Sequence, residues 1–235
     1  MKEDIIPFGD SALIVRFKGK NLESIKRAKK TVELLIREKI KGIIDFIPAI
    51  HSLTIVFDPL VVSFEDLKKR IEKLLLVDTH VKLPPPRTFK IPVVYGGRFG
   101  PDLKFVAEFN GITEEEVIKI HSEKTYRVYM LGFIPGFAYL GEVSKRIETP
   151  RLKAPRTSVP KGSVGIGGSF TGIYPVSSPG GWRIIGMTYF TPFNPEKIPP
   201  VEFDILDKVK FERVSEDEFL SRYRGNIEFI GGSSD

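Results

Sequence analysis

The N-terminal third of the chain alternates between short apolar runs and two segments with helical spacing. Apolar side chains at 22–36 recur every three or four residues, which predicts an amphipathic helix with Asn21 as its N-cap. Ser63 and Asp66 form an acidic variant of the capping box and predict a second helix from Phe64 onward. Strand-like runs lie at 11–17, 43–50 and 53–57. This order predicts a ferredoxin-like α+β unit whose fourth strand is 77–83 or 89–95.

The remainder of the chain changes from helical to strand-like patterning. Three consecutive prolines within 82–87 favour stiff polyproline II and mark a linker. Helices are expected at 102–109 and at 113–122, the second with a Thr113–Glu116 capping box, and a strand is expected at 126–131. Beyond residue 132, glycine or proline breaks up short apolar runs, which favours a β-barrel or sandwich. We therefore expect an α+β domain at 1–86 and a mainly-β barrel domain at 87–235.

Composition narrows the class of protein. The 235 residues include no cysteine, which excludes disulfides, thiolate nucleophiles and cysteine-ligated zinc. No apolar run approaches the roughly 20 residues that cross a bilayer. The first ten residues carry acids and a proline where a signal peptide would be apolar. We therefore expect a cytoplasmic protein with no membrane association.

The distribution of charge and the absence of common motifs argue against several further functions. The net charge of +6 is spread over both halves of the chain without an extended basic face, so we expect no nucleic-acid partner. There is no P-loop, no G-x-S-x-G elbow and no H-E-x-x-H motif. The three histidines are scattered along the chain, so no metal site is expected. These absences disfavour a nucleotide hydrolase that acts alone.

The stretch 132–186 is the most unusual part of the sequence, because it holds 11 of the 21 glycines. Between Glu148 and Glu196 there is no Asp or Glu, although several cations fall there. Arg151 and Arg156 each follow a proline, which restricts the loop, and a guanidinium group binds carboxylate or phosphate through two hydrogen bonds. The pattern favours either a small-anion site or two solvated surface arginines.

Residues 132–141, GFIPGFAYLG, combine glycines and a proline with aromatic side chains. Such a segment forms a barrel corner, an aromatic wall of a small-molecule pocket, or both at once. The candidate lining residues in this segment are Phe133, Pro135, Gly136, Phe137 and Tyr139.

Two more glycine-rich segments follow, at 159–175 and 178–186. In the first, glycines either let free backbone amides bind an anion or shape a bulged hairpin. The second contains the only tryptophan, which is either a core residue or a ligand platform. His121 is a candidate general acid–base, with a satisfied core or surface histidine as the alternative. The candidate binding residues are Gly162, Ser163, Gly165, Gly167, Thr171, Tyr174, Gly181, Trp182 and Arg183.

Taken together, these segments resemble one family. GFIPGFAYLG, the two Pro-Arg pairs, VPKGSVGIGG, TGIYP and SPGGWRIIG are similar to the signature of the B subunit of 5-oxoprolinase (PxpB). This family overlaps with the sporulation kinase inhibitor KipI and with allophanate hydrolase subunit 1. The resemblance covers nearly the whole chain. Two positions depart from it, because Val94 and Arg98 stand where the family usually has Cys and Glu around Tyr-Gly-Gly.

The resemblance implies a fold and a function. It implies a ferredoxin-like domain followed by a cyclophilin-like barrel. The protein would act with two partners of 5-oxoprolinase, an A subunit and a C subunit that resembles allophanate hydrolase subunit 2 (KipA-like). The complex would hydrolyse 5-oxo-L-proline to L-glutamate with ATP. In this role Arg151 and Arg156 would bind the anion and His121 would be the acid–base.

Two alternatives stay open beside this reading of the resemblance. One is a KipI-like inhibitor of a sensor histidine kinase. The other is the carboxyltransferase component of a urea carboxylase or allophanate hydrolase type system.

Overall fold

The computed structural model describes residues 3–76 and 81–223, and its chain divides into two compact units. Unit 1 comprises residues 1–85 and unit 2 residues 86–235, so that the division falls within the run of three prolines. Within the described ranges, no helix combines the length and the apolar character needed to span a membrane.

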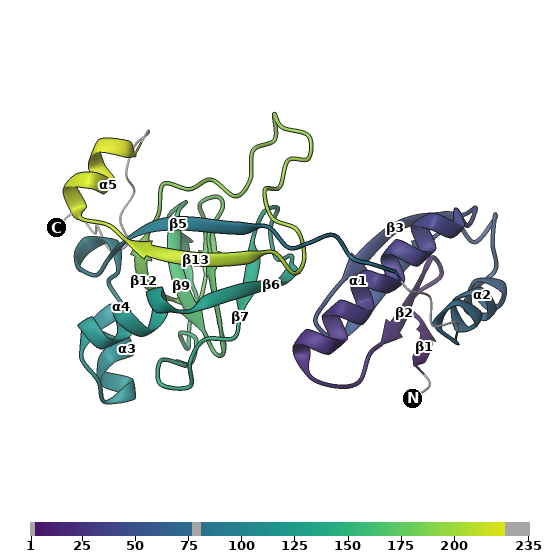
Figure 1. Ribbon diagram of the computed structural model, residues 1–235, viewed down its shortest axis with the longest axis horizontal. Coiled ribbons are helices and arrows are strands. Elements are labelled where there is room, and N and C mark those ends of the chain that lie inside the picture. The colour runs from purple at the N-terminus through teal and green to yellow at the C-terminus, as the bar shows by residue number, and fades with distance from the viewer. Residues whose placement is uncertain (1–2, 77–80, 224–235) are drawn as a thin grey trace. The chain divides into compact units, whose positions relative to one another are not determined.

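Unit 1 is a four-stranded antiparallel sheet with two helices. The sheet order is β1-β2-β4-β3, and α1 lies across one face of the sheet and contacts α2 (Figure 1). Alternate residues of β4 are buried, as expected for a strand with a single covered face. The elements are β1 (Asp4–Pro7), β2 (Ala12–Arg16), α1 (Asn21–Glu38), β3 (Ile43–Pro48), β4 (Ser52–Phe57) and α2 (Phe64–Leu76).

The helix starts in unit 1 are partly as predicted. The capping role of Ser63 is confirmed, because its Oγ accepts a hydrogen bond from the Asp66 backbone N–H at 3.1 Å. The N-cap of α1 is Lys20, so the prediction of Asn21 is wrong. Asn21 is already helical, and its Oδ1 lies 2.7 Å from Nε2 of His51. The Asn21 side chain thus makes a tertiary contact instead of a cap.

Of the two positions predicted for the fourth strand of unit 1, the one at 89–95 is wrong, and the one at 77–83 lies partly outside the described residues. Residues 77–80 lie outside the described residues, and 89–95 fall in a strand of unit 2. The edge position beside β2 is taken by β1, which precedes it in the chain and pairs with it through Ile5–Val15 and Ile6–Ile14. Periodicity missed β1 because it has only four residues and ends in Pro7.

Unit 2 is built around a closed seven-stranded barrel of order β10-β7-β6-β13-β5-β12-β9, which fits the cyclophilin-like architecture expected. In this barrel β5 and β13 pair in parallel. A two-stranded sheet, β11-β8, accompanies the barrel. The strands are β5 (Thr88–Tyr95), β6 (Thr125–Leu131), β7 (Ala138–Gly141), β8 (Arg156–Val159), β9 (Ser163–Gly167), β10 (Phe170–Ile173), β11 (Ser178–Gly180), β12 (Arg183–Met187) and β13 (Lys208–Arg213).

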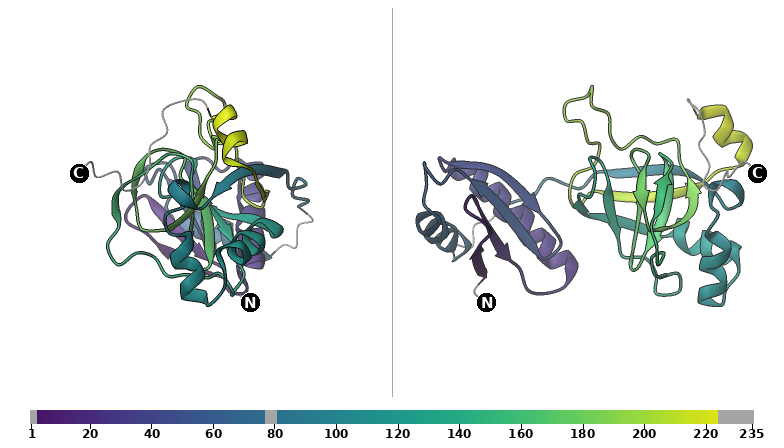
Figure 2. Two further views of the ribbon diagram at one scale, coloured as in Figure 1. Left: turned by 90° about the vertical axis from the view of Figure 1, so that its left-hand side faces the viewer. Right: turned by 180° about the vertical axis from the view of Figure 1, so that it is seen from behind.

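The helices of unit 2 contact the outside and one end of the barrel, as Figures 1 and 2 show. The α4 helix packs beside α3 and contacts β13, and it starts with the predicted Thr113–Glu116 capping box. The α3 helix contacts β12, and α5 contacts β5. Their bounds are η1 (Gly97–Phe99), α3 (Leu103–Asn110), α4 (Glu114–Glu123) and α5 (Glu216–Arg222).

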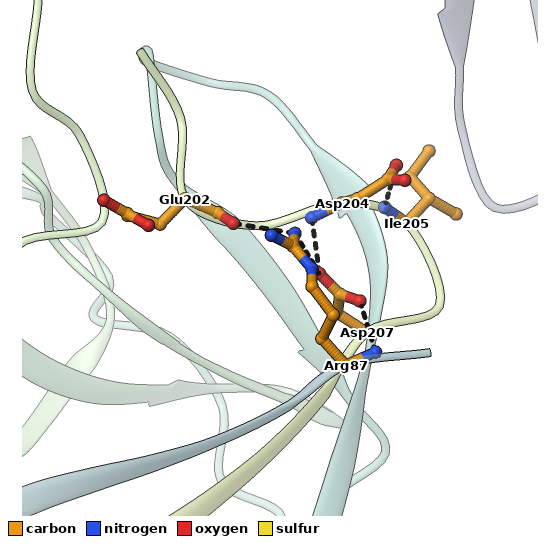
Figure 3. Close-up of polar contacts among 5 residues, drawn as sticks. All are labelled: Arg87, Glu202, Asp204, Ile205 and Asp207. Atoms are coloured by element: carbon orange, nitrogen blue, oxygen red, sulfur yellow. Dashed lines mark hydrogen bonds and ion pairs between the residues drawn. The ribbon is translucent and has the colours of Figure 1, made fainter. Parts of the chain in front are cut away.

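A buried carboxylate fixes the point where the chain enters unit 2 (Figure 3). Asp207 is 4% exposed. Its carboxylate accepts hydrogen bonds from the Arg87 backbone N–H at 2.9 Å and from Arg87 Nε at 3.1 Å. The Asp204 backbone N–H donates to the same carboxylate at 2.9 Å. Arg87 also donates to the carbonyl of Glu202 at 2.8 Å. The first residue after the proline run is thus bound to the segment that leads into β13.

Replacing Asp207 with asparagine is expected to destabilise unit 2 by about 2 kcal/mol. Hydrogen bonds to charged groups contribute roughly 1.5–3 kcal/mol each, and Asn keeps only one accepting oxygen, because its amide nitrogen is a donor and would face the N–H groups of Arg87 or Asp204. Urea unfolding followed by circular dichroism measures the change. Glu212→Gln is the control, because its ion pair with Lys90 is solvent-exposed. Equal stabilities of Asp207→Asn and the control would contradict this role of Asp207.

Candidate functional site

A cavity of about 280 Å³ lies among the aromatic side chains of the glycine-rich stretch. Its walls come from β7 and the segment that leads into it, from the loop before β8, from the residue that follows β10, and from β11 and the turn after it. The lining residues are Phe133, Phe137, Tyr139, Arg151, Leu152, Pro155, Tyr174, Pro179, Gly180, Gly181 and Trp182.

Phe137 is the centre of the aromatic wall. Its ring meets those of Tyr139, Tyr174 and Trp182 edge to face, with centroid distances of 5.1, 5.3 and 5.2 Å. Such arrangements match the negative face of one ring with the positive edge of the next. Phe133 extends this wall and is 60% exposed, and its φ of 77° is in the left-handed region that side chains disfavour. The segment is therefore at once a tight turn into the barrel and a wall of the cavity.

The glycines of β9 and β10 make room for Trp182. Val164 and Ile166 belong to the barrel core, so the alternating Gly165 and Gly167 face outward. A methyl group added at Gly167 would lie 2.5 Å from the Trp182 ring, and one at Gly172 would lie 3.2 Å from it. The tryptophan is thus seated against the outer surface of the barrel wall.

The predicted anion cradle of glycine amides is not present in this cavity. Gly165 and Gly167 lie in β9, which pairs with β10 and β12, and neither lines the cavity. The Gly162 backbone N–H donates to the Tyr174 carbonyl at 2.8 Å. These glycines are required by close packing, which sequence alone does not distinguish from a ligand-binding loop.

Arg151 is the only cation among the described residues that line the cavity. Its guanidinium carbon lies 5.7 Å from the centroid of the Trp182 ring, at cation–π distance. Across residues 3–76 and 81–223, no acidic side chain forms an ion pair with it. An anion in the cavity would therefore meet an uncompensated positive charge above an aromatic surface.

The other two predicted arginines are bound to an acid that the sequence analysis did not single out. Asp102 is 6% exposed and accepts from Arg156 Nη2 at 2.9 Å, and Arg183 Nη1 lies 3.8 Å from the same oxygen. Its second oxygen accepts from the Ile184 backbone N–H at 2.6 Å. The acid-free interval is thus compensated by a residue from the start of α3. The only indication in the sequence that such an acid exists is the excess of positive charge in this interval, which has no acidic residue of its own.

His121 is fully buried and does not line the cavity. Its Nδ1 lies 2.8 Å from the Tyr95 hydroxyl and its Nε2 lies 2.8 Å from the Thr171 hydroxyl. Its ring stacks on Phe211 with a centroid distance of 4.6 Å. Burial lowers the pKa of His121 to about 3, so the ring is neutral at physiological pH. The acid–base role of His121 stays a prediction, and this burial disfavours it.

The depressed pKa of His121 predicts a pH-dependent stability. Between pH 3 and 6.5 the unfolded chain protonates this ring while the folded chain does not, so stability rises with pH across that window and levels off above it. The slope from this one group approaches about 1.4 kcal/mol per pH unit. The groups facing the ring, Tyr95, Thr171 and Tyr126, stay neutral in this window.

Urea unfolding at pH 4.5 to 7 checks this prediction. As the pH falls, the free energy of unfolding of the unmodified protein is expected to decrease relative to that of His121→Phe, which lacks the titrating ring. His51→Gln, at an exposed histidine, is the control. A stability difference between the unmodified protein and His121→Phe that does not change with pH would contradict the prediction.

Seven of the predicted site residues line one cavity: Phe133, Phe137, Tyr139, Arg151, Tyr174, Gly181 and Trp182. Four more lining residues were not singled out, namely Leu152, Pro155, Pro179 and Gly180. The predicted residues outside the lining are His121, Pro135, Gly136, Arg156, Gly162, Ser163, Gly165, Gly167, Thr171 and Arg183. Within the described ranges, no cluster of three or more His, Cys, Asp or Glu is arranged to hold a metal ion.

A second, more polar cavity of about 430 Å³ lies where β5 and β13 end. Its walls include the Tyr-Gly-Gly segment with both positions that depart from the family pattern, Val94 and Arg98. Arg98 forms an ion pair with Glu216, and Arg213 binds Glu115 with two contacts of 2.6 and 2.8 Å. Each arginine here has an acidic partner, whereas Arg151 has none within the part of the chain that the structure describes.

Comparison with known proteins places this geometry in a family. The profile described as "Carboxyltransferase domain, subdomain C and D" matches residues 4–203. The B subunit of 5-oxoprolinase from Bacillus subtilis is 43% identical over 230 residues, covering 93% of this chain and 96% of that protein. The protein of the same name from Haemophilus influenzae is 46% identical over 171 residues, covering 73% and 79% of the two chains.

A solved structure is similar as well. The crystal structure of a conserved uncharacterized protein from Pyrococcus horikoshii has 43% sequence identity and a TM-score of 0.55, covering 92% of this chain and 100% of that one. The family profile extends through both units and includes every residue that lines the aromatic cavity. The chain therefore belongs to the carboxyltransferase subdomain C and D family and, within it, to the group of 5-oxoprolinase B subunits.

Proposed function

We propose that this chain is the B subunit of an ATP-dependent 5-oxoprolinase and that its aromatic cavity binds the substrate. The observation that carries the proposal is the Arg151 guanidinium over Trp182, which lines a cavity of about 280 Å³ and has no acidic partner among the described residues. 5-Oxoproline is a small ring that carries one carboxylate. In this proposal the small ring packs against the aromatic walls, and its carboxylate pairs with the arginine.

The remaining lining groups suit the lactam side of this substrate. Tyr174 is 1% exposed, and burial raises the pKa of its hydroxyl, so this group stays a neutral donor. A lactam carbonyl is a poor electrophile, and phosphorylation of its oxygen by ATP would make it reactive toward water. In that step the cavity holds the ring, and Arg151 offsets the charge of its carboxylate. Arg156, which the resemblance predicts to bind the anion together with Arg151, supports the cavity wall in this proposal instead, because Asp102 already neutralises it.

ATP and the partner proteins complete the proposal. The sequence has no P-loop, so we assign the binding of ATP to the complex, and the chain is inactive alone. The partners are the A subunit of the enzyme and a C subunit similar to allophanate hydrolase subunit 2, in the cytoplasm. We further propose that unit 1 is a variant of the ferredoxin-like fold. The sheet order β1-β2-β4-β3 with two helices supports this, with β1 replacing the usual last strand.

A second candidate function is a carboxyltransferase component acting on a small amide, as in a urea carboxylase system. The description of the matching family favours it. The two functions differ in their co-substrate, because the carboxyltransferase requires a carboxylated biotin carrier and the oxoprolinase does not. Inhibition of a sensor histidine kinase remains a prediction from resemblance.

Reconstitution tests the main proposal. The chain is mixed with the A and C subunits, and ATP hydrolysis that depends on 5-oxoproline is measured with and without it. We expect the activity only when all three proteins are present. Activity that is unchanged when this chain is omitted would contradict the proposal. Activity that requires urea and a biotin carrier instead would favour the carboxyltransferase.

A further inference from the structure

A chain of hydrogen bonds runs from the interior of unit 2 to the wall that supports Trp182. Thr171 Oγ1 donates its single proton to the Gly165 carbonyl at 2.9 Å. At its contact with His121 Nε2, of 2.8 Å, the hydroxyl must therefore accept, which places the imidazole proton on Nε2. Nδ1 then carries the lone pair and accepts from the Tyr95 hydroxyl. All three bonds are satisfied in a single direction, from Tyr95 to Gly165.

The end of this chain lies directly behind the tryptophan. Thr171 pairs with Ile166 in the β9–β10 ladder, and its neighbour Gly172 pairs with Gly165. Gly165 and Gly172 face outward, where an added methyl group at either would come within 3.2 Å of Trp182. Thr171 faces inward and is fully buried. The same two-strand segment is thus held from inside by His121 and carries the cavity wall outside.

We propose that His121 is a positioning residue that, through Thr171, fixes the β9–β10 segment on which Trp182 is seated and so sets the shape of the aromatic cavity. The inference rests on the proposed function in one respect, because it takes this cavity as the substrate site. It also explains why a polar ring lies in an apolar core: the ring links α4 to β5 and β10 through directed bonds that an apolar side chain cannot make.

The fluorescence of Trp182 tests the proposal directly, because Trp182 is the only tryptophan in the chain. Its fluorescence emission is compared between the unmodified protein and Thr171→Val, which removes the hydroxyl while keeping the branched shape. We expect a shifted emission maximum in the ligand-free protein. We also expect the dissociation constant for 5-oxoproline, titrated by the same emission, to rise about three- to tenfold, the effect of one lost buried hydrogen bond.

Two further variants separate positioning from a general loss of stability. Thr171→Ser keeps the hydroxyl and is expected to keep the emission of the unmodified protein. Tyr126→Phe is the matched control, because it removes another buried hydroxyl that donates to the His121 carbonyl at 3.0 Å but is outside the chain of hydrogen bonds. It should lower stability without shifting the emission of Trp182. His121→Phe keeps the stacking on Phe211 and should change the Trp182 emission and the dissociation constant as Thr171→Val does. If Thr171→Val does not fold, His121→Phe tests the positioning role in its place.

Two results would overturn the inference. One is an emission maximum and dissociation constant for Thr171→Val and His121→Phe equal to those of the unmodified protein. The other is a shift in Tyr126→Phe as large as theirs, which would show a merely structural effect. If 5-oxoproline leaves the emission of the unmodified protein unchanged, the proposed function of the cavity fails instead, while the ligand-free emission of the variants still decides the role of His121.

Discussion

Replacing Arg151 with glutamine is expected to lower kcat/KM for 5-oxoproline in the reconstituted complex about 10- to 100-fold. Among residues 3–76 and 81–223, the guanidinium is the only charged group that lines the cavity, and it has no acidic partner there. Its loss removes a charge-assisted hydrogen bond to the substrate carboxylate, which contributes roughly 1.5–3 kcal/mol. Because the carboxylate is bound equally in substrate and transition state, most of the loss should be in KM.

Steady-state ATP hydrolysis at varied 5-oxoproline measures this effect. Lys153→Gln is the matched control, since it removes an exposed cation from the same loop without touching the cavity. Arg151→Lys should be intermediate, because an ammonium keeps the charge but not the planar pair of donors. If Arg151→Gln and Lys153→Gln have equal effects, only the general charge of the loop matters, and the proposed substrate site is contradicted.

Replacing Asp102 with alanine is expected to destabilise unit 2 by about 3–5 kcal/mol. Removing one partner of a buried ion pair leaves the other charge without compensation. Here Arg156 loses its partner at 2.9 Å, and the Ile184 backbone N–H loses its acceptor at 2.6 Å. Asp102→Asn should cost less, because its amide oxygen still accepts from one of the two donors.

Urea unfolding measures the stability of both variants. Glu108→Ala is the control on the same helix, since its ion pair with Lys104 is exposed and spans 3.8 Å. Trp182 emission gives a second readout, because Arg156 also donates to the Trp182 carbonyl at 3.4 Å. A stability of Asp102→Ala within about 0.5 kcal/mol of the control would show that Arg156 and Arg183 are solvated instead of compensated.

The sequence predicted the local structure well where a single periodicity was present. The helices of unit 1, the capping box of α4 and the change to short strands after residue 132 follow from spacing alone. Prediction failed at β1, because four residues ending in proline carry too little periodicity, and because the choice of an edge strand depends on pairing in three dimensions. Cap identity failed at Asn21 for a similar reason, since its side chain contacts His51.

In the candidate site, too, local sequence predicted some features and the fold alone determined others. Aromatic residues close together in sequence, such as Phe137 and Tyr139, line one cavity, because a tight turn keeps them adjacent. The sequence could not decide between the two roles proposed for the glycines. A glycine that makes room for a tryptophan and a glycine that lets an anion approach the backbone look identical in sequence. Only the alternation of β9, with Val164 and Ile166 inside, shows that Gly165 and Gly167 face Trp182.

By itself, the sequence determined that this protein carries aromatic side chains and arginines together in one glycine-rich stretch, with no acidic residue between Glu148 and Glu196, because composition and local spacing are properties of the chain. The tertiary structure decided which of those charges remains free. Asp102 lies 54 positions before Arg156 and binds it, whereas no acid reaches Arg151 among the described residues. Electrostatic compensation depends on distance in space, so folding alone separates the arginine that can bind a ligand from the arginines that hold the wall.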